Sequence, residues 1–448
     1  MTGAPSASAA LAAFVAGASW DDLGEDVRHQ AKRSLLNFIG CALGAAGEPA
    51  VAAAVRVLGS MGGYPEATLI GRSERCDILS ASAVNAIAGN LHDFDDTHLA
   101  TVIHPTAPVA PVVLALAERG GTSGAELLLA LALGMEVACR IGNAVTPDHY
   151  ARGWHITATC GVFGAAAAAA RLLGLSPAMA AHALGIAASQ SAGLVENLTT
   201  AAKNVGVGNA ARNGLLAALM AEAGYDAASQ AIEGPLGWAR ASGDAPDVER
   251  MLAGLGSEWE VLANTFKPYP SGVVLHAVAD ACLALRSRHA LDPGAIARVS
   301  VAGDALLLAR GDRPVRNERD ARVSIQHTVA AVLLTGEAGL AAYAPEMAAD
   351  PATAAFRPRV DAVLDAALPK GAARVDITLV DGRVLSETVI HARGSLAAPL
   401  TDEEIVAKVR ALAGRSRIGA RIDAVIDCVW SLDSLGEASR FCRSLAAP

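Results

Sequence analysis

Apolar residues recur at spacings of three and four through most of the first 263 residues, which predicts a region built of helices. The segments with the clearest pattern are Glu25–Leu43, Ala81–Asp93, Ser123–Ala144 and Pro177–Gln190. Several carry alanine on more than one face, which is typical of helices packed closely against other helices. Ser123, three residues before Glu126, predicts a capping box, and Ser176-Pro177 predicts a helix that begins with proline. We expect no strand in this region.

The pattern changes after Lys267-Pro-Tyr-Pro270, where apolar and polar residues begin to alternate or β-branched residues cluster. The predicted strands are Ile296–Val301, Arg374–Val380 and Arg383–Ile390. Asp381-Gly382 lies between the last two and predicts a hairpin turn. Thr401-Asp-Glu-Glu404 then predicts a capped helix, after which the pattern is helical again.

These patterns predict a mainly α fold with an α+β insertion. A large all-helical domain spans residues 1–265 and is completed by residues 396–448, and a smaller α/β domain spans residues 266–395. We expect the last helices to return to the first domain. The default place for a ligand is a cleft between two such domains.

Composition and charge exclude several classes of protein. Of 448 residues, 52% are hydrophobic and 18% are charged, which excludes intrinsic disorder. Thirty-six basic and 45 acidic residues give a net charge of −9 without a basic run, which argues against a nucleic-acid partner but permits an anionic small molecule. The longest apolar stretches, Glu126–Cys139 and Gly161–Leu175, are too short for a membrane span. Seven scattered cysteines without a CxxC pair predict reduced thiols and a cytoplasmic protein.

The densest polar cluster is His92-Asp-Phe-Asp-Asp-Thr-His98, followed by His104. One interpretation is a metal site, but the spacing fits no zinc or two-metal template, and we expect no metal. Another is a helix C-terminus rich in capping groups. The functional interpretation is acid–base chemistry on a small molecule, because adjacent carboxylates raise one another's pKa and imidazole titrates near neutral pH.

A second cluster contains Tyr150, Arg152 and His155. Tyrosine and histidine can move protons, and arginine can bind a carboxylate with two hydrogen bonds. If a helix begins at His155, its first amides favour an anion. Lys203 and Lys267 stand in otherwise uncharged surroundings, and each is a candidate carboxylate anchor or base, or simply a solvated side chain.

Six motifs together resemble the MmgE/PrpD family, also called the 2-methylcitrate dehydratase family. They are Asp93-Phe-Asp-Asp-Thr97, His104-Pro-Thr, Gly153-Trp-His155, Lys203 with Gly208-Asn-Ala-Ala-Arg212-Asn-Gly, Lys267-Pro-Tyr-Pro and Ser324-Ile-Gln-His327. The resemblance implies a helical main domain with an α/β lid, a homodimer, no cofactor, and a small di- or tricarboxylate substrate. Known members dehydrate 2-methylcitrate, decarboxylate cis-aconitate or epimerise iminodisuccinate.

Differences between this chain and the family motifs allow the three reactions to be ranked. Gly272 stands where cis-aconitate decarboxylases have a histidine, and His327 replaces a tyrosine. The loop from Thr97 to His104 is one residue longer. These differences place decarboxylation last. The form of the first motif and the segment from Tyr150 to His155 resemble the epimerase branch, so we predict an epimerase of the iminodisuccinate type, with a 2-methylcitrate-type dehydratase as the alternative.

The mechanistic hypothesis assigns substrate carboxylates to Arg152, Lys203 and either His104 or His155, with Thr97 as a further substrate-binding residue. Tyr150 and Lys267 are the acid–base groups on opposite faces of the reacting carbon. In a dehydration, Asp93 or a histidine supplies the acid. The non-enzyme alternative is a polycarboxylate-binding protein on the same scaffold.

Overall fold

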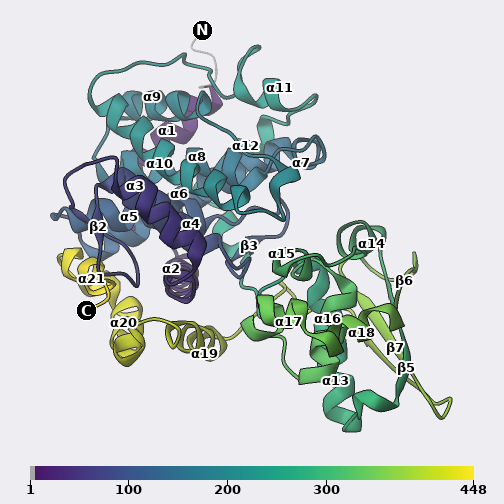
Figure 1. Ribbon diagram of the computed structural model, residues 1–448. Helices are drawn as coiled ribbons and strands as arrows, with labels where there is room; N and C mark the ends of the chain where they lie inside the picture. The colour runs from purple at the N-terminus through teal and green to yellow at the C-terminus, as the bar shows by residue number, and fades with distance from the viewer. Residues whose placement is uncertain (1–5) are drawn as a thin grey trace. The chain divides into compact units, whose positions relative to one another are not determined.

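The computed structural model describes residues 6–448, and the chain forms two compact units (Figure 1). The larger unit comprises Met1–Leu91, Asp95–Asn264 and Thr401–Pro448, and the smaller comprises His92–Phe94 and Thr265–Leu400. The sequence pattern predicts boundaries after residues 265 and 395, whereas the two units divide after Asn264 and Leu400. Three residues of the polar cluster, His92–Phe94, belong to the smaller unit, which no sequence pattern predicts.

The larger unit is helical. Its helices are α1 (Ala7–Gly17), α2 (Glu25–Ala45), α3 (Pro49–Gly59), α4 (Ile78–Asn90), α5 (Thr106–Glu118), α6 (Gly124–Val145), α7 (Asp148–Ala151), α8 (Ile156–Leu172), α9 (Pro177–Ala188), α10 (Ala202–Glu222), α11 (Trp238–Ser242), α12 (Glu249–Leu252), α19 (Asp402–Ala413), α20 (Ile422–Trp430) and α21 (Ser439–Ser444). Strands of two residues each interrupt them where the sequence predicts none: β1 (Ala67–Thr68), β2 (Arg75–Cys76) and β3 (Thr97–His98), with β4 (Asn264–Thr265) at the unit boundary. The expectation of a strand-free region is therefore wrong in detail.

Two of the three helix starts predicted from capping residues form as predicted, and the third forms in part. Thr401 and Glu404 form the complete capping box of α19. The Ser176 side chain accepts from the Met179 amide, so α9 begins at Pro177 as predicted. Ser123 accepts from the Glu126 amide, but the Glu126 carboxylate binds Arg171 instead of returning to the cap. The predicted box at α6 is therefore only half formed.

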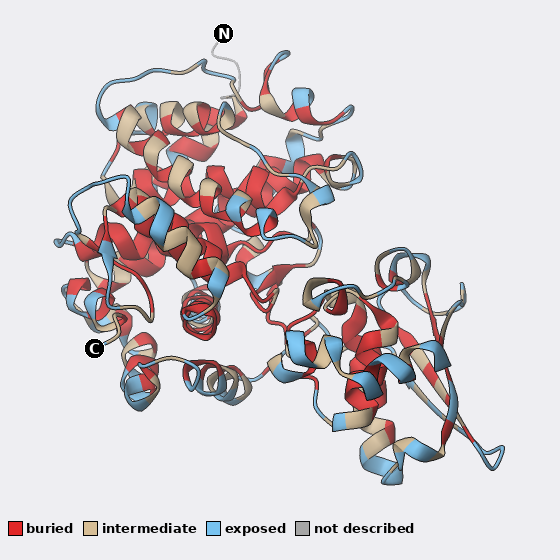
Figure 2. Ribbon diagram, viewed as in Figure 1, coloured by how far each residue is buried: buried red, intermediate tan, exposed pale blue. Residues whose placement is uncertain are grey.

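Small residues allow the central helices of this unit to approach closely, and Figure 2 shows these helices buried. Every residue of α8 from Ile156 to Ala170 is buried. A Cβ atom on Gly134 of α6 would lie 2.6 Å from the Gly164 carbonyl oxygen of α8, and one on Gly164 would lie 2.5 Å from the Gly134 carbonyl oxygen. The alanine-rich pattern thus predicts the core correctly, because two backbones meet where no side chain separates them.

Helix α6 is the one helix of residues 6–448 that is long and apolar enough to cross a membrane, or one of two if α2 and α3, bent by 93°, count as one span. It is wholly buried within the larger unit. It also carries Glu136 and Arg140, which pair at 2.6 Å between Oε1 and Nε. The Arg140 guanidinium donates to the carbonyls of Ala253 at 2.7 Å and Glu258 at 2.6 Å. These contacts tie α6 to the loop that follows α12.

The smaller unit is built on a four-stranded sheet with the order β6-β5-β7-β8. The strands are β5 (Ile296–Gly303), β6 (Val360–Leu364), β7 (Ala373–Leu379) and β8 (Val384–Val389). Strand β5 runs parallel to β6 and antiparallel to β7, and β7 and β8 form the predicted hairpin with Gly382 at a φ of 86°. The three predicted strands are confirmed, but β6 is an additional edge strand.

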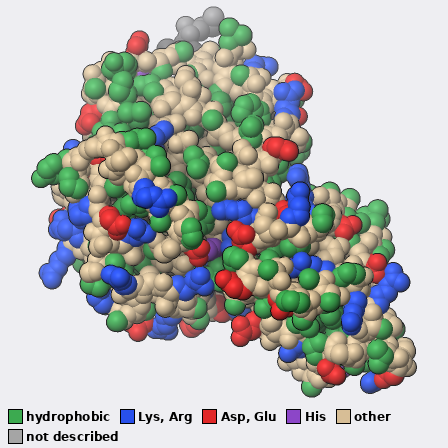
Figure 3. Space-filling model, viewed as in Figure 1, with side chains coloured by type: hydrophobic (Ala, Val, Ile, Leu, Met, Phe, Trp, Pro, Cys, Tyr) green, Lys and Arg blue, Asp and Glu red, His purple; other side chains and the backbone are tan. Residues whose placement is uncertain are grey.

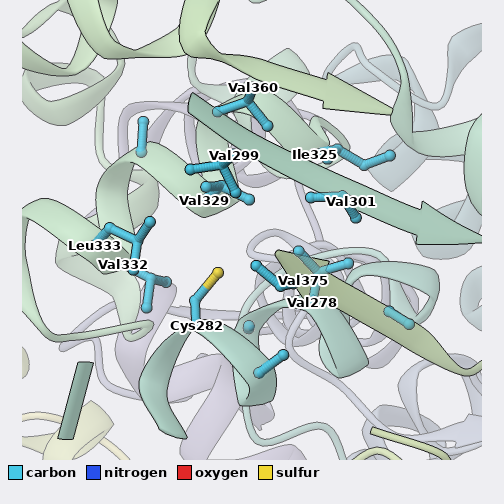
Figure 4. Packing of buried hydrophobic residues seen from close by; sticks show 14 of the residues in the cluster. Val278, Cys282, Val299, Val301, Ile325, Val329, Val332, Leu333, Val360 and Val375 are labelled. Atoms are coloured by element: carbon cyan, nitrogen blue, oxygen red, sulfur yellow. The ribbon is translucent and has the colours of Figure 1, made fainter. Parts of the chain in front are cut away.

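Helices cover this sheet and complete its core. They are α13 (His276–His289), α14 (Ala305–Gly311), α15 (Glu318–Ala321), α16 (Ile325–Thr335), α17 (Pro345–Ala349) and α18 (Pro351–Phe356). Figure 4 shows Cys282 of α13 and Val329 of α16 pointing toward Val299 of β5 and Val375 of β7. The β-branched residues that predict the strands are therefore the residues that form this core.

Candidate active site

Helix α4 ends at Asn90, before the Asp93 end that the apolar pattern predicts. A residue from a distant helix ends it: Asn204 Nδ2 of α10 donates at 3.0 Å to both the carbonyl oxygen and Oδ1 of Asn90. Asn90 Nδ2 in turn donates to Asp95 Oδ2 at 2.6 Å. Asp93 itself has a left-handed φ of 54°. The polar cluster thus lies on a loop beyond the C-terminus of α4.

His104 is held on that loop by its Nδ1 atom. This nitrogen lies 2.7 Å from the Asp96 carbonyl oxygen and 3.1 Å from Thr97 Oγ1. Because a carbonyl oxygen can only accept, Nδ1 carries the proton and Nε2 is the basic nitrogen. The His104 amide donates to Thr157 Oγ1 in the first turn of α8 at 3.1 Å. The structure therefore brings Thr97 and His104 together and ties both to the start of α8.

Asp96 belongs to the same loop, and its side chain is buried. Its Oδ2 accepts from Asn264 Nδ2 at 2.6 Å and from the Thr106 hydroxyl. Burial raises the pKa of Asp96 to about 7, with the neighbouring Asp95 charge as a smaller contribution. The predicted pKa rise in the cluster is therefore present at Asp96, and its main cause is burial rather than repulsion between carboxylates.

A cavity of about 320 Å³ lies in the larger unit beside α8 and α10. Its lining residues come from the start of α8, from one face of α10 and from the loop between α9 and α10: His155, Ala158, Gln190, Ala192, Gly193, Leu194, Asn197, Ala202, Lys203, Val205, Gly206, Asn209, Ala210 and Asn213. The cavity brings together two residues that the sequence singled out separately, His155 and Lys203.

The loop that closes this cavity is held by backbone hydrogen bonds. The His155 amide donates to the Gly193 carbonyl at 3.1 Å, and the Val195 amide donates to the Gly153 carbonyl at 2.8 Å. Gly153 has a φ of 101°, a conformation that a residue with a side chain rarely adopts. The motif Gly153-Trp-His155 therefore shapes the wall of the cavity as well as supplying an imidazole.

The cavity favours an anion. His155 is the N-cap of α8, and Lys203 lies in the first turn of α10, so the positive ends of two helix dipoles meet there. Lys203 is buried and is the one Lys, Arg, Asp or Glu among the residues that line the cavity. On the face shown in Figure 3, charges of both signs are scattered over the larger unit. The positive character of the cavity comes from Lys203 and from the two helix N-termini.

Tyr150 and Arg152 lie in and just after the short helix α7. The Arg152 guanidinium is 3.4 Å from the Asp148 carboxylate and 2.6 Å from that of Asp244, and its side chain is 41% exposed. Neither Tyr150 nor Arg152 lines the cavity of His155 and Lys203. In this structure Arg152 serves a surface ion pair, which the sequence could not show because Asp244 is remote in the chain.

Lys267 and Asp93 pair within the smaller unit. Lys267 Nζ lies 3.1 Å from Asp93 Oδ1 and 3.0 Å from the Asp93 carbonyl oxygen, and the Lys267 side chain is 2% exposed. Two oxygens of one residue thus hold the ammonium, and the left-handed backbone of Asp93 turns both toward it. Asp93 and Lys267, which belong to motifs far apart in sequence, therefore form one ion pair.

Two further histidines, His149 before the second cluster and His327 of the sixth motif, are structural. Burial lowers the pKa of His149 to about 4, and its ring bonds Thr159 Oγ1 at 2.7 Å. Burial also lowers the pKa of His327 to about 4, and its Nε2 donates to the Ala342 carbonyl at 2.8 Å. His327, in the place of a family tyrosine, is therefore a neutral core group of the smaller unit.

Models of one protein family match two consecutive parts of the chain. Residues 9–251 match the MmgE/PrpD N-terminal domain, and residues 269–432 match the MmgE/PrpD C-terminal domain. The second match extends past the end of the smaller unit into the returning helices.

Curated relatives match along most of the chain. A cis-aconitate decarboxylase of Aspergillus terreus (strain NIH 2624 / FGSC A1156) is 29% identical over 462 residues, covering 96% of this chain and 93% of the relative. The cis-aconitate decarboxylase of Mus musculus is 28% identical over 463 residues, covering 99% and 94%. That of Homo sapiens is 29% identical over 384 residues, covering 82% and 79%. These relatives carry the name of the reaction that the motif departures rank last.

Proposed function

Because the chain belongs to the MmgE/PrpD family, we propose that it is an enzyme that moves a proton at a carbon next to a carboxylate of a small polycarboxylate. The observation that carries this proposal is the cavity that joins His155 and Lys203 at the first turns of α8 and α10. An ammonium group and two helix N-termini stabilise both a bound carboxylate and the negative charge that develops on it when the proton leaves.

The geometry ranks the candidate residues. Lys203 is the principal carboxylate anchor, because Arg152 is engaged by Asp148 and Asp244. His104 is a base through Nε2, since its Nδ1 proton is directed to the Asp96 carbonyl. Thr97 supports that imidazole. Lys267 pairs with Asp93 and is proposed as the second acid–base group.

The first candidate reaction is epimerisation of the iminodisuccinate type. One group removes the α-proton, the electron pair is delocalised into the adjacent carboxylate, and a second group returns a proton on the opposite face. Tyr150 and Lys267 remain the two groups that the sequence motifs propose for this exchange, and neither is among the residues that line the cavity of His155 and Lys203. The form of the Asp93–Thr97 motif favours this candidate over dehydration of a 2-methylcitrate-type substrate.

The second candidate is decarboxylation, which the relatives named cis-aconitate decarboxylase favour. There the bond between carbon and a carboxylate breaks, the electron pair stays on the carbon, CO₂ leaves, and an acid protonates the carbon. Gly272 in place of the histidine of that branch argues against this reaction. The same carboxylate anchor serves each candidate.

Proton NMR in D₂O tests the proposal with iminodisuccinate isomers, 2-methylcitrate, citrate and cis-aconitate, with a chelator present. Deuterium at the α-carbon without new vinyl signals identifies an epimerase. New vinyl signals identify a dehydratase or a decarboxylase, and released CO₂ identifies the latter. No deuterium exchange or new product with any of these acids would contradict the proposal.

Substitutions of two lysines, one in the cavity and one at an exposed position, serve as the test and its control. Lys203→Met keeps the length of the side chain and removes its charge, so turnover should fall by about 100-fold or more. Lys370→Met removes an exposed ammonium of the smaller unit and should leave turnover unchanged. Equal activity of the two variants would remove Lys203 from the site.

Assembly and location follow from the same proposal. We propose a homodimer, as the family resemblance implies, acting in the cytoplasm on a small di- or tricarboxylate.

Six of the seven cysteines are buried, and burial raises the pKa of Cys139 and Cys160 among them, which makes these thiols poor nucleophiles.

A further inference from the structure

Uncharged amide side chains line part of the cavity that contains Lys203. They belong to Gln190, Asn197, Asn209 and Asn213. Asn209 and Asn213 are four residues apart on α10 and therefore lie on one face of that helix. Carboxamides differ from the rest of the lining, which is mainly alanine, glycine and branched apolar residues apart from His155 and Lys203. The amides therefore offer a second type of recognition within the same cavity.

The two types of recognition are separated along the cavity. Helices α8 and α10 run parallel, because Gly206 approaches Ala158 and Gly214 approaches Val162 and Ala166. Their positive N-termini therefore lie at the same end, with His155 and Lys203. Asn209 is six residues beyond Lys203, or about 9 Å along the helix axis, and Asn213 lies one turn farther. The cavity thus passes from an end with His155 and Lys203 to an end with amide side chains, where Arg212 Nε donates to Asn213 Oδ1.

Hydrogen bonds orient the groups at the amide end. Asn213 Oδ1 accepts from Arg212 Nε at 3.4 Å, which leaves Asn213 Nδ2 as a donor. Gln190 Nε2 donates to the Asn213 carbonyl at 3.4 Å, which leaves Gln190 Oε1 as an acceptor. A donor and an acceptor are therefore presented at one end of the cavity. A hydroxyl group satisfies both, whereas a carboxylate can only accept.

We propose that Gln190, Asn209 and Asn213 form a specificity subsite for an uncharged group of the ligand that both donates and accepts hydrogen bonds, a hydroxyl being the simplest. This inference rests on the proposed function, because the carboxylate at the Lys203 end sets the position of the rest of the ligand. A ligand without such a group displaces water from the amides and leaves them unpaired, which weakens its binding.

Calorimetric titration with citrate and with propane-1,2,3-tricarboxylate, which lacks the citrate hydroxyl, tests the subsite on the full chain. The wild type should bind citrate about tenfold more tightly, as expected for one satisfied donor–acceptor group. Asn213→Leu should raise the Kd of citrate to that of the other acid and leave the latter unchanged. Lys203→Met should weaken both acids alike. Asn209→Leu, on the same wall, gives a second test in a separately folded protein.

The outcomes separate the subsite from the function on which it rests. Equal Kd values for the two acids in the wild type, or an equal loss for both in Asn213→Leu, would overturn the subsite and leave the carboxylate site standing. Binding of neither acid to the wild type would overturn the carboxylate site and the subsite together. A citrate preference that Asn213→Leu and Asn209→Leu both abolish supports the proposal.

Discussion

Replacing Asp96 with asparagine should make the larger unit less sensitive to alkaline pH. Asp96 is buried with Oδ2 bonded to Asn264 and Thr106, and burial raises its pKa to about 7. Ionising this carboxyl therefore costs roughly 4 kcal/mol more in the folded protein than in the unfolded chain. Asparagine has the same shape and carries no charge at any of these pH values.

The sign follows from proton binding. Between the ordinary pKa of 3.8 and the raised pKa of about 7, the folded state holds a proton that the unfolded state has lost. The free energy of unfolding therefore falls as pH rises through this window and levels off above it. Between about pH 5.5 and about pH 8.5 this one carboxyl removes roughly 2 kcal/mol of stability. Asp96→Asn should therefore gain roughly 2 kcal/mol relative to the wild type over the same interval.

Urea unfolding followed by tryptophan fluorescence measures this difference. All five tryptophans lie in the larger unit, so the signal reports the unit that contains Asp96. Asp226→Asn, at an exposed position of the same unit, is the matched control. The reasoning is refuted if the difference between Asp96→Asn and the wild type is the same at both pH values, or if it decreases toward alkaline pH.

Three further predictions address chemistry, packing and assembly. Lys267→Ala and Tyr150→Phe should each lower turnover by about 100-fold or more without changing the circular dichroism spectrum, and near wild-type rates in both would contradict the two-base assignment. Gly164→Ala should lower the free energy of unfolding by roughly 1–3 kcal/mol, because its Cβ would lie 2.5 Å from the Gly134 carbonyl oxygen. The control is Gly17→Ala, whose Cβ meets nothing within 4 Å and which should cost no stability. Equal urea midpoints for the two variants would contradict this account. Light scattering after gel filtration should give twice the 45.4 kDa chain mass, and a single-chain mass would exclude the proposed homodimer.

Local sequence patterns predicted the elements well where local forces set them. Apolar spacing located α2, α6 and α9, and the β-branched residues and Asp381-Gly382 located β5 and the following hairpin. The end of α4 was wrong because Asn204, more than one hundred residues away, binds the carbonyl of Asn90. Strand β6 was missed because it is an edge strand whose Val363 is 45% exposed, so it lacks a buried alternating face.

The titratable residues of the cavity could be singled out from the sequence, and the roles of its uncharged residues could not. Lys203 stood out in uncharged surroundings and His155 in a cluster with Tyr150 and Arg152, and these two residues line one cavity. Asn209 and Asn213 lie within the fourth family motif and are four residues apart on one helix face, but as uncharged residues they were assigned no role from the sequence. The roles of Arg152 and His327 depend on partners remote in sequence, and only the folded chain shows them.

The ion pair between Lys267 and Asp93 has a consequence for recombination within the family. The residues that contact one another in the smaller unit come from two separate stretches of the chain, His92–Phe94 and Thr265–Leu400. A chimera that exchanges only the second stretch with a relative would join a buried lysine to a foreign 92–94 loop. Chimeras that fold and function should therefore exchange both stretches together, so that Asp93 and Lys267 come from the same parent protein.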